Sequence, residues 1–130
     1  MFATTMIDVA DVEAASAWYQ RLLGLTSGHG GPDFEMLMSG KDLCLMLHRR
    51  YIADHGHPGS DGGAPLGNGV TLYFRLDEDF DAGVERAREM GVPIVQGPEF
   101  NELAKRQELW VTDPDGYSVV LAGPSSWGAS

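Results

Sequence analysis

The sequence is poor in cysteine and in basic residues. It has one cysteine, Cys44, so no disulfide can form within the chain, and a reducing cytoplasm is the expected compartment. Nine Lys and Arg residues stand against 19 Asp and Glu residues, which gives a net charge of −10. Nucleic-acid binding needs a basic surface for the phosphates, so this balance argues against such a partner and favours a cationic ligand.

Long apolar stretches are also missing. No run approaches the roughly 20 residues of a membrane span, and the first residues lack the basic and apolar regions of a secretory signal. We therefore expect no membrane partner. The apolar share of 43% and the charged share of 22% are typical of a globular protein. A chain of 130 residues is long enough for one domain with a real core.

Two segments of the chain follow the same pattern, which predicts a repeated unit. Residues 11–24 and 79–91 each open with an Asp suited to cap a helix and close with a Gly suited to end one. One strand-like run precedes each helix and three follow it. The predicted fold is α+β, with two βαβββ modules over about 3–50 and 69–124 and a Gly- and Pro-rich linker over about 51–68.

The strand-like runs lie at 4–10, 25–28, 34–39 and 42–48 in the first module, and at 70–76, 92–96, 103–112 and 117–122 in the second. The sequence DPDG before the last run predicts a tight turn. Pro114 fixes its own φ and pushes Asp113 toward extended geometry, while Gly116 is free to take a positive φ. The strands on either side of this turn should therefore form a hairpin.

These features together resemble one family. The stretches DVEAASAWYQRLLGL and ELWVTDPDGYSVVL, and the second helix ending in MGV, are similar to the glyoxalase, bleomycin-resistance and extradiol-dioxygenase superfamily. The resemblance runs from about residue 3 to residue 124 and implies the vicinal oxygen chelate fold, with curved mixed sheets around a cleft. It also implies a homodimer. Enzymes of the family usually hold a divalent metal in the cleft through His, Gln or Glu side chains.

The four metal-ligand positions that the resemblance implies carry other residues here. They fall on Thr4, Met46, Thr71 and Val120. Two hydroxyls, one thioether and one isopropyl group do not make a divalent-metal site, so we expect neither a metal nor another cofactor. A shift of the first strand by several residues would bring Asp8 into play, which leaves a displaced site open.

The histidines add little to a metal site. His55 and His57 flank a glycine in the linker without a carboxylate or Cys at a recurrent ligand spacing, so a solvated loop is the favoured interpretation. His29 lies in a Gly-rich turn that lacks the strand-then-helix context of a phosphate loop. His48 is two residues from Met46 in the same strand-like run, so its side chain should point to the same side and face the cleft.

Strand alternation selects the side chains that should line the cleft. If Thr71 faces the cleft, so do Tyr73 and Arg75. The predicted ligand-binding residues are Asp8, Met46, His48, Tyr73, Arg75, Glu108, Trp110 and Val120. This mostly apolar wall with a few polar groups suits a small-molecule site, although the same residue types also form ordinary core. A buried Arg75 would need Asp8 or Glu108 as its partner.

Three functions are open from the sequence. A metal-independent binding protein of the bleomycin-resistance type would sequester a small aromatic and, given the charge, cationic compound, as antibiotic-resistance proteins do. A metal-dependent lyase, isomerase or dioxygenase of the same superfamily would need displaced ligands. A regulatory module would have a filled cleft. No catalytic constellation stands out, and the net charge of −10 together with the missing ligands favours the binding protein.

Overall fold

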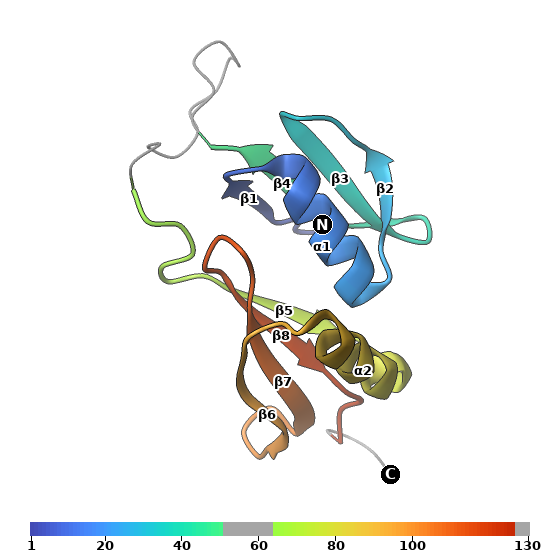
Figure 1. Cartoon of the computed structure of the whole chain (residues 1–130). Helices are drawn as coiled ribbons and strands as arrows, with labels where there is room; N and C mark the ends of the chain where they lie inside the picture. Colours follow the sequence, from blue (N-terminus) through green and yellow to red (C-terminus); the bar gives the residue numbers. More distant parts are fainter. Residues whose placement is uncertain (51–63, 127–130) are drawn as a thin grey trace. The chain divides into compact units, whose positions relative to one another are not determined.

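The computed structural model describes residues 1–50 and 64–126. The chain divides into two compact units, Met1–Leu66 and Gly67–Ser130. In Figure 1 each α-helix lies against one face of the sheet of its own unit. The α+β fold with two βαβββ modules is therefore confirmed, while most of the predicted linker lies outside the described residues. No helix in the described residues is long and apolar enough to cross a membrane.

The two modules share one topology. The first contains β1 (Met6–Val9), α1 (Val12–Leu23), β2 (Thr26–His29), β3 (Phe34–Ser39) and β4 (Asp42–Arg49). The second contains β5 (Thr71–Arg75), the short 3₁₀ helix η1 (Asp77–Asp79), α2 (Phe80–Met90), β6 (Ile94–Asn101), β7 (Arg106–Thr112) and β8 (Ser118–Ala122). The sheet orders are β1-β4-β3-β2 and β5-β8-β7-β6. In each sheet the first pair of strands is parallel and the other pairs are antiparallel.

The predicted helix ends are confirmed at three of four positions. The side chain of Asp11 accepts a hydrogen bond from the backbone N–H of Ala14 at 2.9 Å. Gly24 and Gly91 end α1 and α2 with φ of 69° and 66°. Asp79 makes no capping hydrogen bond with its side chain. It has φ −89° and ψ 8° because η1 runs directly into α2, and side-chain capping needs an extended backbone.

The strand β6 is longer than the sequence predicted. The run at 92–96 suggested a short strand, but β6 spans Ile94–Asn101 and includes Pro98. Proline cannot donate to a ladder and is tolerated in edge strands. In the described sheet β6 is an edge strand and pairs only with β7, which explains how Pro98 fits there.

The hairpin of β7 and β8 forms as predicted. The buried Asp113 accepts hydrogen bonds through Oδ1 from the backbone N–H groups of Asp115 at 2.9 Å and Tyr117 at 2.8 Å. Gly116 has φ 98°, which confirms the predicted positive φ. The Asp113 side chain therefore organises the turn from inside.

Each sheet has a helix-facing side and an opposite side, called here its open face. The helix-facing side of the first sheet carries Ile7, Val9, Leu37, Leu45 and Leu47, and that of the second carries Leu72, Leu109, Val111, Val119 and Leu121. All ten side chains are buried. Because side chains alternate along a strand, the residues between them project from the open faces.

Candidate functional site on the open sheet faces

The predicted site residues lie in two groups, one on the open face of each sheet. The first sheet carries Asp8, Met46 and His48, and the second carries Tyr73, Arg75, Glu108, Trp110 and Val120. The alternation rule thus placed every one of these side chains on the face opposite the helix. Each group is described within its own unit below.

Glu108 is the centre of the polar contacts on the second open face. Its side chain is 3% exposed. Oε2 accepts a hydrogen bond from the hydroxyl of Tyr73 at 2.5 Å. Oε1 accepts hydrogen bonds from Asn101 Nδ2 at 2.9 Å and from Trp110 Nε1 at 3.0 Å. One buried carboxylate therefore fixes the positions of two aromatic side chains on two different strands.

These contacts shift the pKa values of both titratable partners. Desolvation, the hydrogen bond to Glu108 and the charge of Glu108 together raise the pKa of Tyr73 to about 12. Desolvation alone would raise the pKa of Glu108, but the hydrogen bonds from Tyr73, Asn101 and Trp110 outweigh it and hold this pKa below its ordinary value. At neutral pH the cluster is a carboxylate surrounded by neutral donors.

Tyr73, Val120 and Trp110 form a row across β5, β8 and β7. Val120 is the register partner of both aromatic residues, and all three project from the open face. Val120 is fully buried, whereas Tyr73 is 41% exposed and Trp110 is half-buried. Two aromatic rings on either side of a buried valine make an apolar surface that solvent can reach, and this surface suits a flat ligand.

Arg75 was expected to need Asp8 or Glu108 as a partner only if it were buried. It is exposed, and no residue in the described part of the chain forms an ion pair with it. Its register partner Ala122 separates it from Glu108 in the same row. Glu108 is hydrogen-bonded to Tyr73 instead, so Arg75 presents an available positive charge at the edge of the second open face.

The first open face combines an acid–imidazole pair with thioethers. Asp8 and His48 are register partners, and Asp8 Oδ1 lies 3.5 Å from His48 Nδ1. His48 is 1% exposed and Asp8 is 22% exposed. Next to this pair, Met46 has Met6 as its partner on β1 and Met36 as its partner on β3. We call Met6, Met46 and Met36 the thioether row.

A second buried carboxylate, Glu35, lies on the helix-facing side of β3 and was not among the predicted site residues. It is 3% exposed and accepts hydrogen bonds from the hydroxyl of Ser16 on α1 at 2.7 Å and from that of Ser27 on β2 at 2.8 Å. The backbone N–H of Met36 also donates to it at 2.9 Å. Glu35 therefore joins α1 to the sheet. Glu35 is two residues from Leu37 on the same strand and should therefore share its face, which was the signal available in the sequence.

The donors at the implied metal positions do not fit a divalent ion. Thr4 lies before β1, and Thr71 is the first residue of β5. Met46 and Val120 are the middle members of the two rows and offer a thioether and no donor, respectively. Among residues 1–50 and 64–126, no group of three or more His, Cys, Asp or Glu side chains could hold a metal. His55 and His57 lie outside the described residues.

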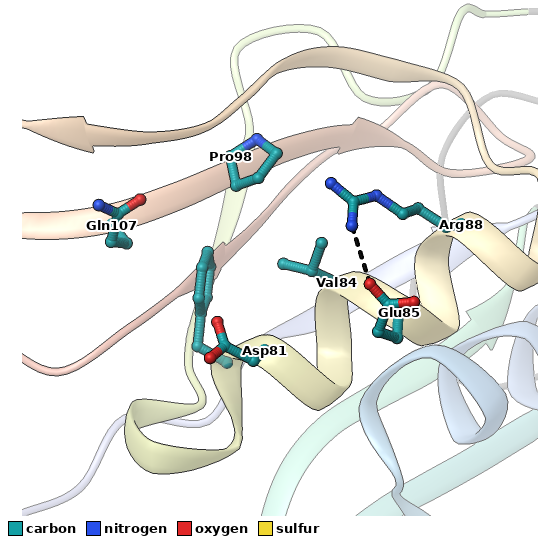
Figure 2. Close-up of a pocket in the computed structure, with 7 residues that line it drawn as sticks. Asp81, Val84, Glu85, Arg88, Pro98 and Gln107 are labelled. Atoms are coloured by element: carbon teal, nitrogen blue, oxygen red, sulfur yellow. Dashed lines mark hydrogen bonds and ion pairs between the residues drawn. The ribbon is translucent and has the colours of Figure 1, made fainter.

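A pocket of about 410 Å³ lies on the helix-facing side of the second sheet. It is lined by Phe80, Asp81, Val84, Glu85, Arg88, Pro98 and Gln107. Figure 2 shows side chains of α2 on one side and Pro98 and Gln107 on the other. None of the predicted site residues lines it. Its rim carries the exposed Arg88–Glu85 ion pair at 2.8 Å, and the pocket therefore lies at the surface between α2 and the strands β6 and β7.

Two βαβββ modules, each with one helix against a mixed sheet, define the vicinal oxygen chelate fold. Residues 2–121 match the sequence model of the Glyoxalase/Bleomycin resistance protein/Dioxygenase superfamily, and the chain belongs to this family.

Three solved structures illustrate the likeness. Lactoylglutathione lyase from Agrobacterium tumefaciens is 20% identical with a TM-score of 0.70, over 98% of this chain and 96% of that one. A glyoxalase/bleomycin resistance protein/dioxygenase from Nocardioides is 19% identical with a TM-score of 0.73, over 97% and 84%. The fosfomycin resistance protein FosX from Listeria monocytogenes is 12% identical with a TM-score of 0.70, over 98% and 95%. At these identities the likeness shows the fold.

Proposed function

We propose that this protein binds a small aromatic compound on the open face of its second sheet, without the divalent metal of the family's enzymes. The observation that carries this proposal is the pair of aromatic side chains, Tyr73 and Trp110, held by the buried Glu108 on either side of Val120. A ring surface fixed before the ligand arrives loses little side-chain entropy on binding.

The hydrogen bonds also favour a cationic ligand. Tyr73 and Trp110 both donate to a carboxylate, which polarises the donors and leaves their rings richer in electrons. A cation over such a ring gains about 0.5–2 kcal/mol, depending on desolvation. The net charge of −10 raises the local concentration of cations. Arg75 opposes this preference, so the charge of the ligand has to be measured.

A thermal-shift screen tests the ligand class. Benzyltrimethylammonium, phenylacetamide and phenylacetate are similar in size and differ in charge. We expect the cation to give the largest shift, because its advantage over the neutral compound is electrostatic, and this advantage should shrink with salt. At 100 times its dissociation constant it should stabilise the protein by about 2.7 kcal/mol. Larger shifts with phenylacetate would make Arg75 the anchor and contradict the cationic preference.

Variants test the location of the ligand. Trp110→Leu should abolish the shift caused by benzyltrimethylammonium. Phe100→Leu is the matched control, because Phe100 is an exposed aromatic residue of the same sheet whose register partner, Gln107, lines the pocket beside α2. Equal shifts in both variants would place the ligand elsewhere.

Elemental analysis of the untagged protein, purified without added metal, tests the absence of a divalent metal. We expect no stoichiometric zinc, manganese, iron, nickel or cobalt. One equivalent per chain would favour the second candidate, a metal-dependent lyase, isomerase or dioxygenase with displaced ligands. Asp8 and His48 support that candidate, because two side chains of ligand type lie 3.5 Å apart. Loss of the metal in Asp8→Asn would then locate the site.

We also propose that the protein is a homodimer. The edge strand β6 and the following turn expose Ile94, Val95, Phe100 and Leu103. An edge strand with exposed apolar side chains is prone to pair with another chain. Analytical ultracentrifugation should show a dimer that Val95→Lys weakens. A monomer at all accessible concentrations would contradict this proposal.

A further inference from the structure

The thioether row places three methionines side by side on the first open face. Met46 on β4 is the register partner of Met6 on β1 and of Met36 on β3. The alternating residues Ile7, Leu47 and Glu35 are buried on the helix-facing side, which places the three methionines on the opposite face. Half of the six methionines of the chain therefore stand side by side on three adjacent strands.

The spacing of a sheet lets these side chains meet at one point. Directly opposite residues on neighbouring strands have Cβ atoms about 4.5–5.5 Å apart. A methionine side chain is unbranched and has three rotatable bonds, so the outer sulfurs can turn toward the middle one. Met6 is 48% exposed, and Met36 and Met46 are half-buried, so an ion from solvent can reach the row.

The chemistry of the donors determines which ion they suit. Thioethers are soft ligands that select Cu(I), whereas carboxylates and carbonyls suit hard divalent ions. Met46 stands at one of the positions where the resemblance implies a divalent-metal ligand. We propose that the thioether row of Met6, Met46 and Met36 is a binding site for a soft monovalent cation of the Cu(I) and Ag(I) class. This inference concerns the first module and does not rest on the aromatic ligand proposed for the second.

The same three residues could also be an adaptable apolar surface, since methionine often fills irregular contacts. The two interpretations differ in one respect. An apolar surface keeps its properties when methionine is replaced by leucine, but a thioether site loses a ligand. Met46→Leu preserves size and hydrophobicity and therefore separates the two.

The experiment uses the full chain carrying Cys44→Ser, so that the thiol does not compete for the ion. Methionines labelled with ¹³C in the methyl group are followed by NMR while Ag(I) is added in chloride-free buffer, and Cu(I) affinity is measured anaerobically against a chromophoric chelator. We expect one Ag(I) per chain, with the methyl signals of Met6, Met36 and Met46 moving together. Met90, a half-buried methionine of α2, provides the matched control.

Met46→Leu should weaken Cu(I) binding by about tenfold or more, because substitutions that only perturb a metal's supporting groups already cost that much. Met90→Leu should leave the affinity unchanged. The proposal is overturned if the three methyl signals stay in place at one equivalent of Ag(I), or if Met46→Leu and Met90→Leu bind Cu(I) equally well.

Discussion

The two modules have the same topology but carry different types of side chain at equivalent positions of their open faces. The strands β1, β4 and β3 correspond to β5, β8 and β7 in sheet order. The central row of the open face reads Met6–Met46–Met36 in the first module and Tyr73–Val120–Trp110 in the second. A repeated fold therefore supports two different surfaces, because the ladder fixes which positions face outward and leaves their side chains free to differ.

The buried carboxylates differ in the same way. Glu35 and Glu108 lie on the equivalent strands β3 and β7, and each is 3% exposed. Glu35 faces its helix and is hydrogen-bonded to Ser16, whereas Glu108 faces away from its helix and orients Tyr73. The first carboxylate joins its helix to the sheet, and under the proposed function the second orients aromatic side chains for the ligand.

The largest expected effect comes from breaking the first carboxylate network. Glu35→Leu leaves buried donors without an acceptor and should lower the free energy of unfolding by about 3 kcal/mol. Counted from the start of each helix and along each central strand, Ser16 corresponds to Val84 and Glu35 to Leu109. The double variant Ser16→Val/Glu35→Leu copies the second module and should recover part of the loss. Urea denaturation measures both, and equal stability of single and double variants would contradict the correspondence.

Replacing the glycine in the turn before the last strand of each module should change the stability by a smaller amount, and by different amounts in the two modules. Gly116 has φ 98°, beyond the usual left-handed region, whereas Gly40 between β3 and β4 has φ 58°, inside it. We expect Gly116→Ala to cost about 2–3 kcal/mol and Gly40→Ala about 1 kcal/mol. A Cβ at Gly40 would meet no atom within 4 Å, so backbone strain is its only cost. Equal melting temperatures for the two variants would show that the DPDG turn is less demanding.

The Glu108 cluster should give the smallest change in stability, about 1 kcal/mol for Tyr73→Phe at neutral pH. Because the pKa of Tyr73 is raised to about 12, its contribution is complete below the ordinary pKa of 10 and is lost as the pH rises through about 12. The pKa of Glu108 is lowered, so its contribution is present above its ordinary pKa and is lost as the pH falls through the lowered value.

An ultraviolet absorbance titration checks the tyrosine shift. One of the four tyrosines should ionise near pH 12, and Tyr73→Phe should remove that step. A Tyr73 that ionises near pH 10 would show that Glu108 does not hold its hydroxyl in solution.

Much of the fold could be predicted from the sequence, because periodicity and turn residues are local signals. The alternation of Tyr73 and Trp110 placed them correctly on the open face. Predicting the contacts between strands requires the register of the strands, and no local sequence pattern determines that register. The three donors to Glu108 and the pairing of Met36 with Met46 became visible only in the sheet.

Two other differences depend on contacts between elements, which alternation cannot reveal. The alternation of Glu35 with Leu37 indicates its face, but its burial depends on the contacts of β3 with Ser16 and Ser27. The exposure of Arg75 depends on where β5 lies in the sheet, since β5 is an edge strand. In both cases the alternation indicates the face of the sheet from which the side chain projects, and the neighbouring elements determine how deeply it is buried.

The most direct test of the difference between the modules is ¹⁹F NMR of protein labelled with 5-fluorotryptophan. The resonances of Trp110 and of Trp18 on α1, assigned with Trp→Phe variants, are followed while benzyltrimethylammonium is added. We expect the Trp110 resonance to move in a saturable way while that of Trp18 stays in place, because the aromatic surface belongs to the second open face. Movement of Trp18 with a fixed Trp110 would contradict the assignment of ligand binding to the second module.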